Sequence, residues 1–361
     1  MKKLNYDELT IVYLDYKGVS RKKIHELLKL DKSIYEVVSN LSSKAREIIG
    51  EKKLENFSNI NLKEELDKLN EYLIKTEINV STTIGDDFPL FLREIPDPPV
   101  IIYYYGDLEI VNSPYIIGIV GTRKPTYYGK TATDKFVRVL VGEANFVTVS
   151  GLAYGIDSEV AKKTLEYNGK HIAILGGGLK KLYPKSNIGL AEKIIENGGL
   201  VMSEYFPTLS PAQYTFPDRN RLISGLSHGV LVVEAGVNSG SLITATCAIN
   251  QGKELFVIPA DIDNENNLGS NQLIEELPET FTSSPRRILK AFGINLDATS
   301  DSIKLTEDEK RVLDVLSTGA KTVDELCEII EEDFKSLNLL LTEMEIGGII
   351  RKLQGDYYSK V

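Results

Sequence analysis

From residue 114 onward, short apolar runs alternate with segments of helix length. Six runs have this character: YIIGIV (115–120), NFVTV (145–149), HIAIL (171–175), LVMSE (200–204), GVLVVE (229–234) and ELFVI (254–258). Nearly continuous apolar strands separated by helices are typical of a parallel sheet that is covered by helices on both faces. The pattern therefore predicts an α/β core built on a parallel sheet.

Glycine or another small residue follows four of these strands directly. The positions are Gly121, Ser150-Gly151, Gly176-Gly177-Gly178 and Ala235-Gly236. The carboxyl ends of parallel strands share one edge of an open sheet, and ligands bind at that edge. Four such loops therefore predict a binding site there.

The first 75 residues read as short helices. Ser20 is a candidate N-cap, and Ile24, Leu27 and Leu28 share one helical face behind it. A helix-hairpin-helix that contacts phosphate is one interpretation of this region. A helical packing module is favoured, because lysines are common on any solvated helix face.

The last 70 residues predict a winged helix. Residues 293–305 show no periodicity and read as a linker, after which Thr306 with Glu309 and Thr322 with Glu325 form two capping boxes. A third helix is expected at 333–346, ending at Gly347-Gly348, and the terminal IIRKLQGDYYSKV alternates as a hairpin with a Gly-Asp turn. The expected divisions are a helical domain at 1–78, a core at 79–292, a linker at 293–303 and a winged helix at 304–361.

Charge is distributed unevenly along the 361 residues. The net charge of −10 divides into −4 for residues 1–112, +1 for residues 113–290 and −7 for residues 291–361. The middle segment is thus the only part that could meet a polyanion without strong repulsion. A net charge of +1 is compatible with a basic groove, because the local clustering of charges governs phosphate contacts better than net charge does. The acidic winged helix is better suited to a protein contact than to DNA.

Composition indicates a cytoplasmic protein. No apolar run follows Lys2 and Lys3, so no secretory signal is expected, and no stretch approaches the roughly 18 apolar residues of a membrane span. Cys247 and Cys327 are too few for a disulfide framework. The three histidines lack metal-ligand spacing, so no structural zinc is expected.

Two familiar nucleotide motifs are absent. The first loop, GTRKPTYYGK, is not the G-x-G-x-x-G of a dinucleotide fold, and the second strand ends in Ser150 rather than an acid. Gly121 lies eight positions before Gly129, whereas a P-loop requires five. A nicotinamide cofactor and ATP hydrolysis are both disfavoured, and we expect no cofactor.

The same loops carry groups that suit an oligophosphate. Arginine forks and lysine point charges bind phosphate, and helix N-termini attract anions. For one such residue alone, a solvated or ion-paired surface group is the favoured interpretation; for a set drawn from three loops of one edge, binding is favoured. The candidates are Gly121, Thr122, Arg123, Ser150, Gly151, Gly155, Gly176, Gly177, Gly178, Lys185, Arg219, Asn220, Arg221, Ser239, Gly240 and Ser241.

Aromatic residues are interleaved with these charges, and bases of a single strand stack on such rings. Several of them are expected to be ordinary core. Asp157 is expected to cap its helix, while Glu204 and Glu234 end strands and are candidates to pair with the arginines; no catalytic residue is assigned. The aromatic residues are Tyr127, Tyr128, Tyr154, Tyr183, Tyr205, Phe206, Tyr214 and Phe216.

Seven ordered blocks resemble the DprA/Smf family (DNA-processing protein A). They are GIVGTRKPTYYG, VSGLAYGID, AILGGGLKKLYPKSN, SEYFPTLSP, FPDRNRLISGL, VVEAGVNSGSLITA and VIPADID followed by LGSNQLI. The match runs from about residue 85 to 280. The C-terminal segment resembles that family's winged helix, and the N-terminal helices resemble its sterile-alpha-motif-like domain.

This resemblance implies a Rossmann-like core that binds single-stranded DNA, helps load the RecA recombinase in natural transformation, and forms a homodimer. Arg123 resembles the arginine of the family's G-[ST]-R turn, Lys185 the lysine of its Y-P-K segment, and Arg219 with Arg221 its R-N-R pair. All four are then expected to contact DNA.

Three positions depart from the family pattern. Tyr154 stands where an arginine is usual, Lys162 follows Ala161 where an Ala-His pair is usual, and Ala260 replaces the glycine of a Pro-Gly. Tyr154 removes a basic group but supplies a ring for stacking.

The leading interpretation is a non-enzymatic, single-stranded DNA-binding recombination mediator. The alternative is a nucleotide phosphoribohydrolase of the lysine-decarboxylase-like Rossmann group, whose P-G-G-x-G-T-x-x-E motif uses a glutamate. The corresponding AGVNSGSLITA lacks that glutamate. A scaffold without a ligand leaves the four glycine loops at one edge unexplained.

Overall fold

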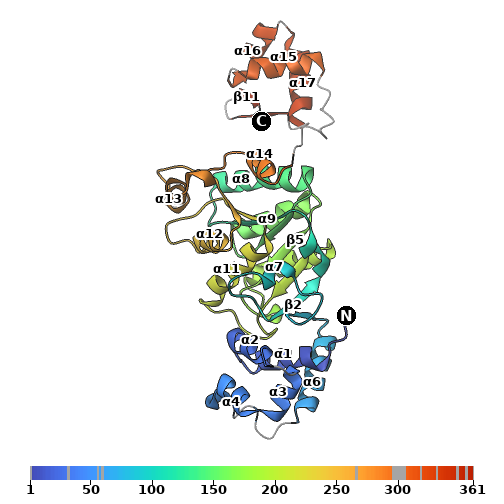
Figure 1. The fold of residues 1–361 in the computed structure, drawn as a ribbon. Helices are drawn as coiled ribbons and strands as arrows, with labels where there is room; N and C mark the ends of the chain where they lie inside the picture. The colour runs from blue at the N-terminus through green and yellow to red at the C-terminus, as the bar shows by residue number, and fades with distance from the viewer. Residues whose placement is uncertain are drawn as a thin grey trace. The chain divides into compact units, whose positions relative to one another are not determined.

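The chain forms two compact units, residues 1–294 and residues 295–361. The computed structural model describes residues 2–30, 33–54, 57, 61–264, 267–294, 306–317, 319–330, 332–346, 349–353 and 357–360. Figure 1 shows the order of the elements along the chain. Within the described residues, no helix has the length and apolar character needed to cross a membrane.

A helical module begins the first unit, as the sequence predicts. Asn5 and Glu8 form a capping box that starts its first helix, and Ile24 and Leu27 are fully buried in its core. Ser20 occupies the predicted N-cap position without a side-chain capping bond. The helices are α1 (Tyr6–Tyr16), α2 (Arg21–Leu28), α3 (Ile34–Asn40), α4 (Ser43–Ile49), α5 (Glu51–Leu54) and α6 (Leu62–Lys75).

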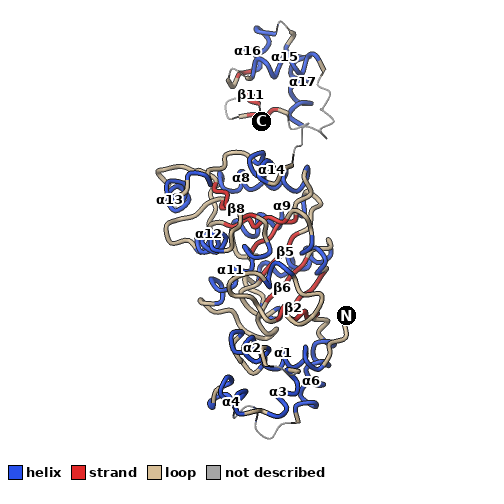
Figure 2. The backbone as a smooth tube through the Cα atoms, viewed as in Figure 1, coloured by secondary structure: helices blue, strands red, loops and turns tan. Residues whose placement is uncertain are grey.

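An eight-stranded sheet forms the centre of the unit, between layers of helices (Figure 2). The strands are β1 (Asn79–Thr82), β2 (Ile101–Gly106), β3 (Ile116–Val120), β4 (Val147–Ser150), β5 (His171–Ile174), β6 (Leu200–Ser203), β7 (Gly229–Val232) and β8 (Glu254–Val257). Their order is β1-β2-β6-β5-β4-β3-β7-β8. The six predicted strands pair in parallel, which confirms the predicted α/β core, whereas β1 and β2 add an antiparallel edge that the sequence pattern did not reveal.

Alternate side chains of each strand enter different cores, which explains the continuous apolar runs. On β5, Ile172 and Ile174 pack with Leu222 of α11, whereas Ala173 packs with Ile194 of α10. Helices α8, α9 and α10 pack in sequence, and α11 packs on α12. The helices are α7 (Leu90–Arg93), α8 (Tyr127–Val137), α9 (Ile156–Glu166), α10 (Ile188–Glu196), α11 (Thr215–Leu226), α12 (Gly240–Asn250), α13 (Leu268–Glu276) and α14 (Pro285–Ala291), with shorter turns η2 (Leu108–Asn112), η3 (Arg138–Glu143), η4 (Leu179–Lys181), η5 (Lys185–Asn187) and η6 (Pro278–Thr280).

The second unit is a winged helix. Both predicted capping boxes are present: Thr306 and Glu309 cap one helix, and Thr322 and Glu325 exchange hydrogen bonds at the next. Its elements are α15 (Glu307–Leu316), β9 (Lys321–Thr322), α16 (Val323–Ile330), α17 (Phe334–Ile346), β10 (Ile350–Lys352) and β11 (Tyr357–Lys360). β10 and β11 form the predicted antiparallel hairpin. The predicted Gly347-Gly348 stop, the Gly-Asp turn and nearly all of the linker lie outside the described residues.

Candidate nucleic-acid interface

A cleft of about 630 Å³ opens at the carboxyl edge of the sheet. Gly121 and Arg123 reach it from the loop after β3, and Ala153 reaches it from the loop after β4. Helix α11, the first turn of α12, Asp157 of α9, Tyr183 and the segment 211–213 also line it. β3 lies between β4, which the chain enters next, and β7, which it enters only after crossing back through α11. The cleft thus occupies the topological switch point, where open α/β sheets bind ligands.

Glycines let the loops after β3 and β4 touch. A Cβ on Gly121 would lie 2.7 Å from Ile156 Cγ1, and one on Gly155, whose φ is +80°, would lie 2.3 Å from the Thr122 carbonyl oxygen. The Thr122 N–H donates to the Glu234 carbonyl at 2.7 Å. That amide is therefore occupied within the fold, contrary to its expected availability for a phosphate.

The triple glycine of residues 176–178 is buried rather than open to the cleft. A Cβ on Gly176 would lie 2.7 Å from Phe216 Cδ1, and one on Gly178 would lie 2.2 Å from the Phe206 carbonyl oxygen. These glycines let the segment before α11 lie directly on the strand end. Their role in this structure is close packing, not an exposed phosphate cradle.

Ser150 and Gly151 are buried at the end of β4. The Ser150 hydroxyl donates to the Asp157 carbonyl at 3.1 Å. The Asp157 carboxylate accepts from the N–H groups of Gly151 at 3.0 Å and Ala153 at 3.4 Å, and burial raises its pKa. Asp157 therefore has a structural role, but the predicted helix cap is wrong: Gly155 is the N-cap of α9, and the Asp157 carboxylate holds the preceding loop.

Arg219 forms part of the cleft wall with its side chain almost fully buried. It is 3% exposed, and its Nη1 donates to the carbonyls of Gly151, at 2.9 Å, and Ile174. A Cβ on Gly151 would lie 2.2 Å from Arg219 Nη2, so the glycine makes room for the guanidinium. Burial lowers the pKa of Arg219 to about 10, which leaves it charged at neutral pH. Arg219 ties α11 to the ends of β4 and β5.

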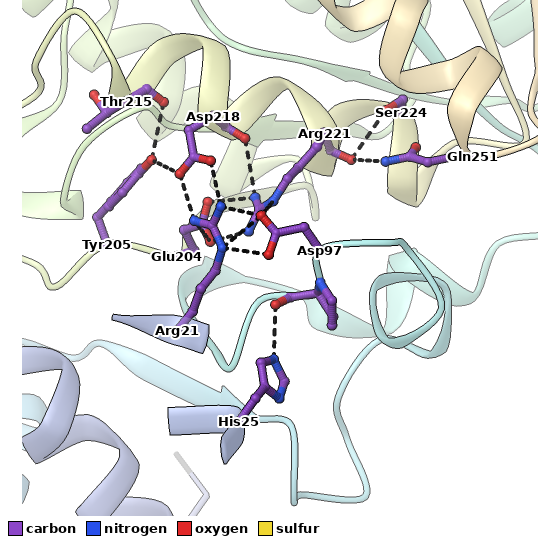
Figure 3. A network of polar contacts seen from close by, with 11 residues as sticks. Arg21, His25, Asp97, Glu204, Tyr205, Thr215, Asp218, Arg221, Ser224 and Gln251 are labelled. Atoms are coloured by element: carbon purple, nitrogen blue, oxygen red, sulfur yellow. Dashed lines mark hydrogen bonds and ion pairs between the residues drawn. The ribbon is translucent and has the colours of Figure 1, made fainter. Parts of the chain in front are cut away.

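Arg221 turns away from the cleft into a buried ion pair (Figure 3). Its Nη1 and Nη2 donate to the two carboxylate oxygens of Glu204 at 2.7 and 2.6 Å. Arg21 of α2 joins the same network through Asp97 and through Asp218, which it contacts at 2.7 Å. Glu204 thus pairs with an arginine as expected. Arg221, predicted to hold a phosphate, is 7% exposed and engaged by Glu204.

Arg123 is the exposed arginine of the cleft. Its guanidinium lies over the Phe216 ring, 5.4 Å from the centroid. Tyr183 lies 6.0 Å from Phe216, and Tyr154 lies 6.2 Å from Tyr183, so three rings continue from the arginine. Both tyrosines are nearly half exposed. A cation beside exposed rings is the combination that holds a phosphate and stacks a base.

Lys185 lies next to the cleft rather than in it. It borders an adjoining hollow, which shares Tyr183 and Pro211 with the cleft. The side chain is exposed.

The start of α12 faces the cleft through Ser239, Gly240 and Ser241. Ser239 is the N-cap, and its hydroxyl accepts from the Ser241 N–H at 3.3 Å. Asn220 donates its Nδ2 to the Gly240 carbonyl at 3.0 Å, which fixes α11 against this turn. The positive end of the α12 dipole therefore adds to the charge of Arg123 and Arg219.

Glu234 stabilises the fold and does not line the cleft. Its side chain is fully buried and accepts from the N–H and hydroxyl of Thr126, which caps α8. Among the described residues that line the cleft, Asp157 is the only acid, and it is held by backbone amides. The described part of the cleft therefore offers no unengaged carboxylate for hydrolysis, and no described group of histidines, cysteines and acids is arranged to hold a metal.

Sequence comparison places two known domains on the chain. Residues 79–293 match the DNA recombination-mediator protein A family, and residues 297–356 match the DprA winged helix domain. Protein Smf of Escherichia coli is 34% identical over 280 residues, which cover 75% of this chain and 74% of that protein. DNA processing protein DprA of Streptococcus pneumoniae is 40% identical over 200 residues, covering 55% and 70%.

Two solved structures resemble the fold. The structure of DNA processing protein A from Streptococcus pneumoniae superposes with a TM-score of 0.66 at 32% identity, covering 81% of this chain and all of that one. A structure of the Helicobacter pylori protein, described for its single-stranded DNA binding mode, gives a TM-score of 0.53 at 31% identity, covering 59% of this chain and 95% of that one.

Proposed function

Because the chain belongs to the DNA recombination-mediator protein A family, we propose that it binds single-stranded DNA in the cleft at the carboxyl edge of its sheet. It is a DNA-processing recombination mediator. The observation that carries the proposed site is the exposed Arg123 guanidinium beside Phe216 and Tyr183, within a wall that includes the α12 N-terminus.

In this proposal Arg123 binds backbone phosphate while Tyr183, Phe216 and Tyr154 supply faces for bases. The α12 turn at Ser239–Ser241 supports the same phosphate electrostatically. Lys185 contacts the strand where it leaves over Tyr183. Arg219 and Asn220 shape the wall, and Arg221 stabilises α11 from the other side.

We further propose that the mediator acts as a homodimer in the cytoplasm and hands the strand to a RecA recombinase, as in natural transformation. This part rests on family membership. The division into 1–78, 79–292 and 304–361 is retained as the working domain scheme, with the acidic winged helix assigned to a protein contact.

Catalysis is not part of the proposal. The phosphoribohydrolase alternative requires a carboxylate poised over the bound sugar phosphate, and the described acids near the cleft, Asp157 and Glu234, are already engaged by backbone or hydroxyl groups. The charged wall and the rings suit retention of a strand, not its cleavage.

Titration of a fluorescent oligothymidine, single-stranded and as a duplex with oligoadenosine, tests the proposal. Tighter binding of the single strand is expected, because only unpaired bases can stack on Tyr183 and Phe216. Equal affinity for both forms, or binding of neither, would contradict it.

A further inference from the structure

A second hollow of about 660 Å³ adjoins the cleft beyond Tyr183. It lies between α10 and the segment that runs from η4 to Lys185. Tyr183 and Pro211 line both spaces. A flexible polymer that leaves the cleft over the Tyr183 ring therefore enters this hollow next.

The floor of the hollow is apolar. Val201 of β6, Ala191 of α10 and Leu179 of η4 line it and are each less than 9% exposed. Tyr105 at the end of β2 forms part of the wall. Its volume falls within the range of small-molecule sites, and its aliphatic and aromatic lining suits one flat heterocyclic ring.

Three exposed lysines surround this apolar floor: Lys180, Lys181 and Lys185. The Lys180 ammonium lies over the Tyr105 ring, 5.5 Å from its centroid. Within the described part of the chain, none of the three forms an ion pair with a carboxylate, and Glu192 is the only acid in the lining. An apolar floor with a cationic rim complements a molecule that joins a ring to phosphates.

We propose that this hollow, here called the lysine pocket, holds a second nucleobase of the DNA strand that occupies the cleft. Lys180, Lys181 and Lys185 bind the phosphates that flank that base, and Tyr183 separates it from the base in the cleft. The inference rests on the proposed function. It adds a subsite, a direction for the strand across the sheet edge, and a minimum ligand length.

An apolar side chain of a partner protein is the other candidate occupant. The three lysines disfavour it, because Glu192 is the only described acid in the lining and leaves most of their charge to be balanced by an anionic occupant. If a protein is the occupant, removing the lysines will leave DNA binding unchanged, so the DNA experiment decides between the two.

The first arm of the test removes the rim charge. The double variant Lys180→Ala/Lys181→Ala is expected to bind a long oligothymidine about tenfold more weakly than wild type, and the slope of log affinity against log salt should flatten by about 1.4, or 0.7 per lost phosphate contact. Lys162→Ala/Lys193→Ala is the matched control, because these exposed lysines do not line either space.

The second arm locates the bases. Oligothymidines with one abasic site at successive positions are expected to show two positions at which wild-type affinity falls about tenfold. Ala191→Leu, which fills the lysine pocket with an apolar side chain, should abolish the penalty at one position and keep it at the other. Circular dichroism checks that each variant is folded.

The outcomes separate the inference from the proposed function. The lysine-pocket proposal is wrong if wild type shows only one abasic position that weakens binding and if the lysine double variant keeps wild-type affinity and salt slope. The proposed DNA-binding role of the cleft would still stand. Wild type that does not bind oligothymidine at all overturns the proposed function itself.

Discussion

Arg219 and Arg221 lie two residues apart on α11 and engage opposite sides of it. Arg219 donates to the carbonyls at the ends of β4 and β5 beside the cleft, whereas Arg221 is paired with Glu204 on the side that meets the helical module. A helix advances about 100° per residue, so positions i and i+2 cannot share a face. The two arginines therefore anchor α11 from both sides, and they leave Arg123 as the exposed arginine of the cleft.

Removing Arg219 should destabilise the core. Arg219→Ala leaves the buried carbonyls of Gly151 and Ile174 without this donor, and each such loss costs about 1–3 kcal/mol. We expect the free energy of unfolding to fall by about 2–6 kcal/mol, measured by chemical denaturation, with the salt dependence of DNA affinity unchanged. Full stability combined with a flattened salt slope would instead restore the phosphate role first predicted for Arg219.

Removing Arg221 should leave the buried Glu204 carboxylate without its closest counter-charge, with Arg21 Nη1 remaining 3.8 Å away. Breaking a buried ion pair by deleting one partner costs about 3–5 kcal/mol, so Arg221→Ala should lower the free energy of unfolding by that amount. The double variant Arg221→Ala/Glu204→Gln should recover part of the loss, because it removes the buried charge that has lost its closest partner. Equal stability of the single and double variants would argue against the pairing as the source of stability.

Asp15 should make stability depend on pH. Its carboxylate accepts from the Tyr103 hydroxyl at 2.7 Å, and burial raises its pKa to about 7. The folded state then binds a proton more tightly than the unfolded state, whose aspartate pKa is about 3.9. Stability contributed by Asp15 is therefore complete below about pH 4, declines as the pH rises to 7, and is lost above that.

Asp15→Asn keeps an acceptor for Tyr103 but does not titrate. Relative to wild type, its free energy of unfolding should rise with pH from 4 to 7 and then level off, a relative gain on the order of 4 kcal/mol, because the pKa differs by about three units at about 1.36 kcal/mol each. Denaturation curves of the two proteins at pH 4.5, 6, 7 and 8 measure this difference. A difference that stays constant over that range would show that Asp15 does not titrate there.

The proposed homodimer can be tested by measuring the mass of the protein in solution. Sedimentation equilibrium at micromolar concentration should report about twice the chain mass of 40.2 kDa. The reason is the homodimer that we propose on the basis of family membership, not a periodicity in the sequence. A mass that stays at one chain across that concentration range would oppose the dimer.

The sequence predicted the core sheet well because its strands are buried on both faces. Strand β5 is an uninterrupted apolar run because its two faces pack into different cores: Ile172 and Ile174 into one, and Ala173 into the other. Strand β2 was missed although IIYYYG is equally apolar. It follows a Pro-rich segment. Its antiparallel partner, β6, lies almost 100 residues later in the chain, and no local sequence pattern indicates such a pairing.

At the site, the sequence did not predict the directions in which the arginine side chains point. Arg219 and Arg221 are close in sequence, but on helix α11 their side chains point to different faces. This difference in direction can be predicted only if a helix is assigned to the whole R-N-R segment. Arg21 and Asp97 belong to the network around Arg221 but lie far from it in sequence, so the network in Figure 3 gave no local signal. Tyr183 and Phe216 were among the aromatic residues named as stacking candidates, but the sequence did not separate them from Phe206, which packs against the core.

The salt dependence of single-stranded DNA binding by Arg123→Ala tests the central claim most directly. If the Arg123 guanidinium holds a phosphate, the variant should bind oligothymidine more weakly and its slope of log affinity against log salt should be flatter by about 0.7. Arg138→Ala is the control, since that exposed arginine follows the carboxyl end of α8, away from the cleft. A folded Arg123→Ala protein with wild-type affinity and slope would contradict the proposed site.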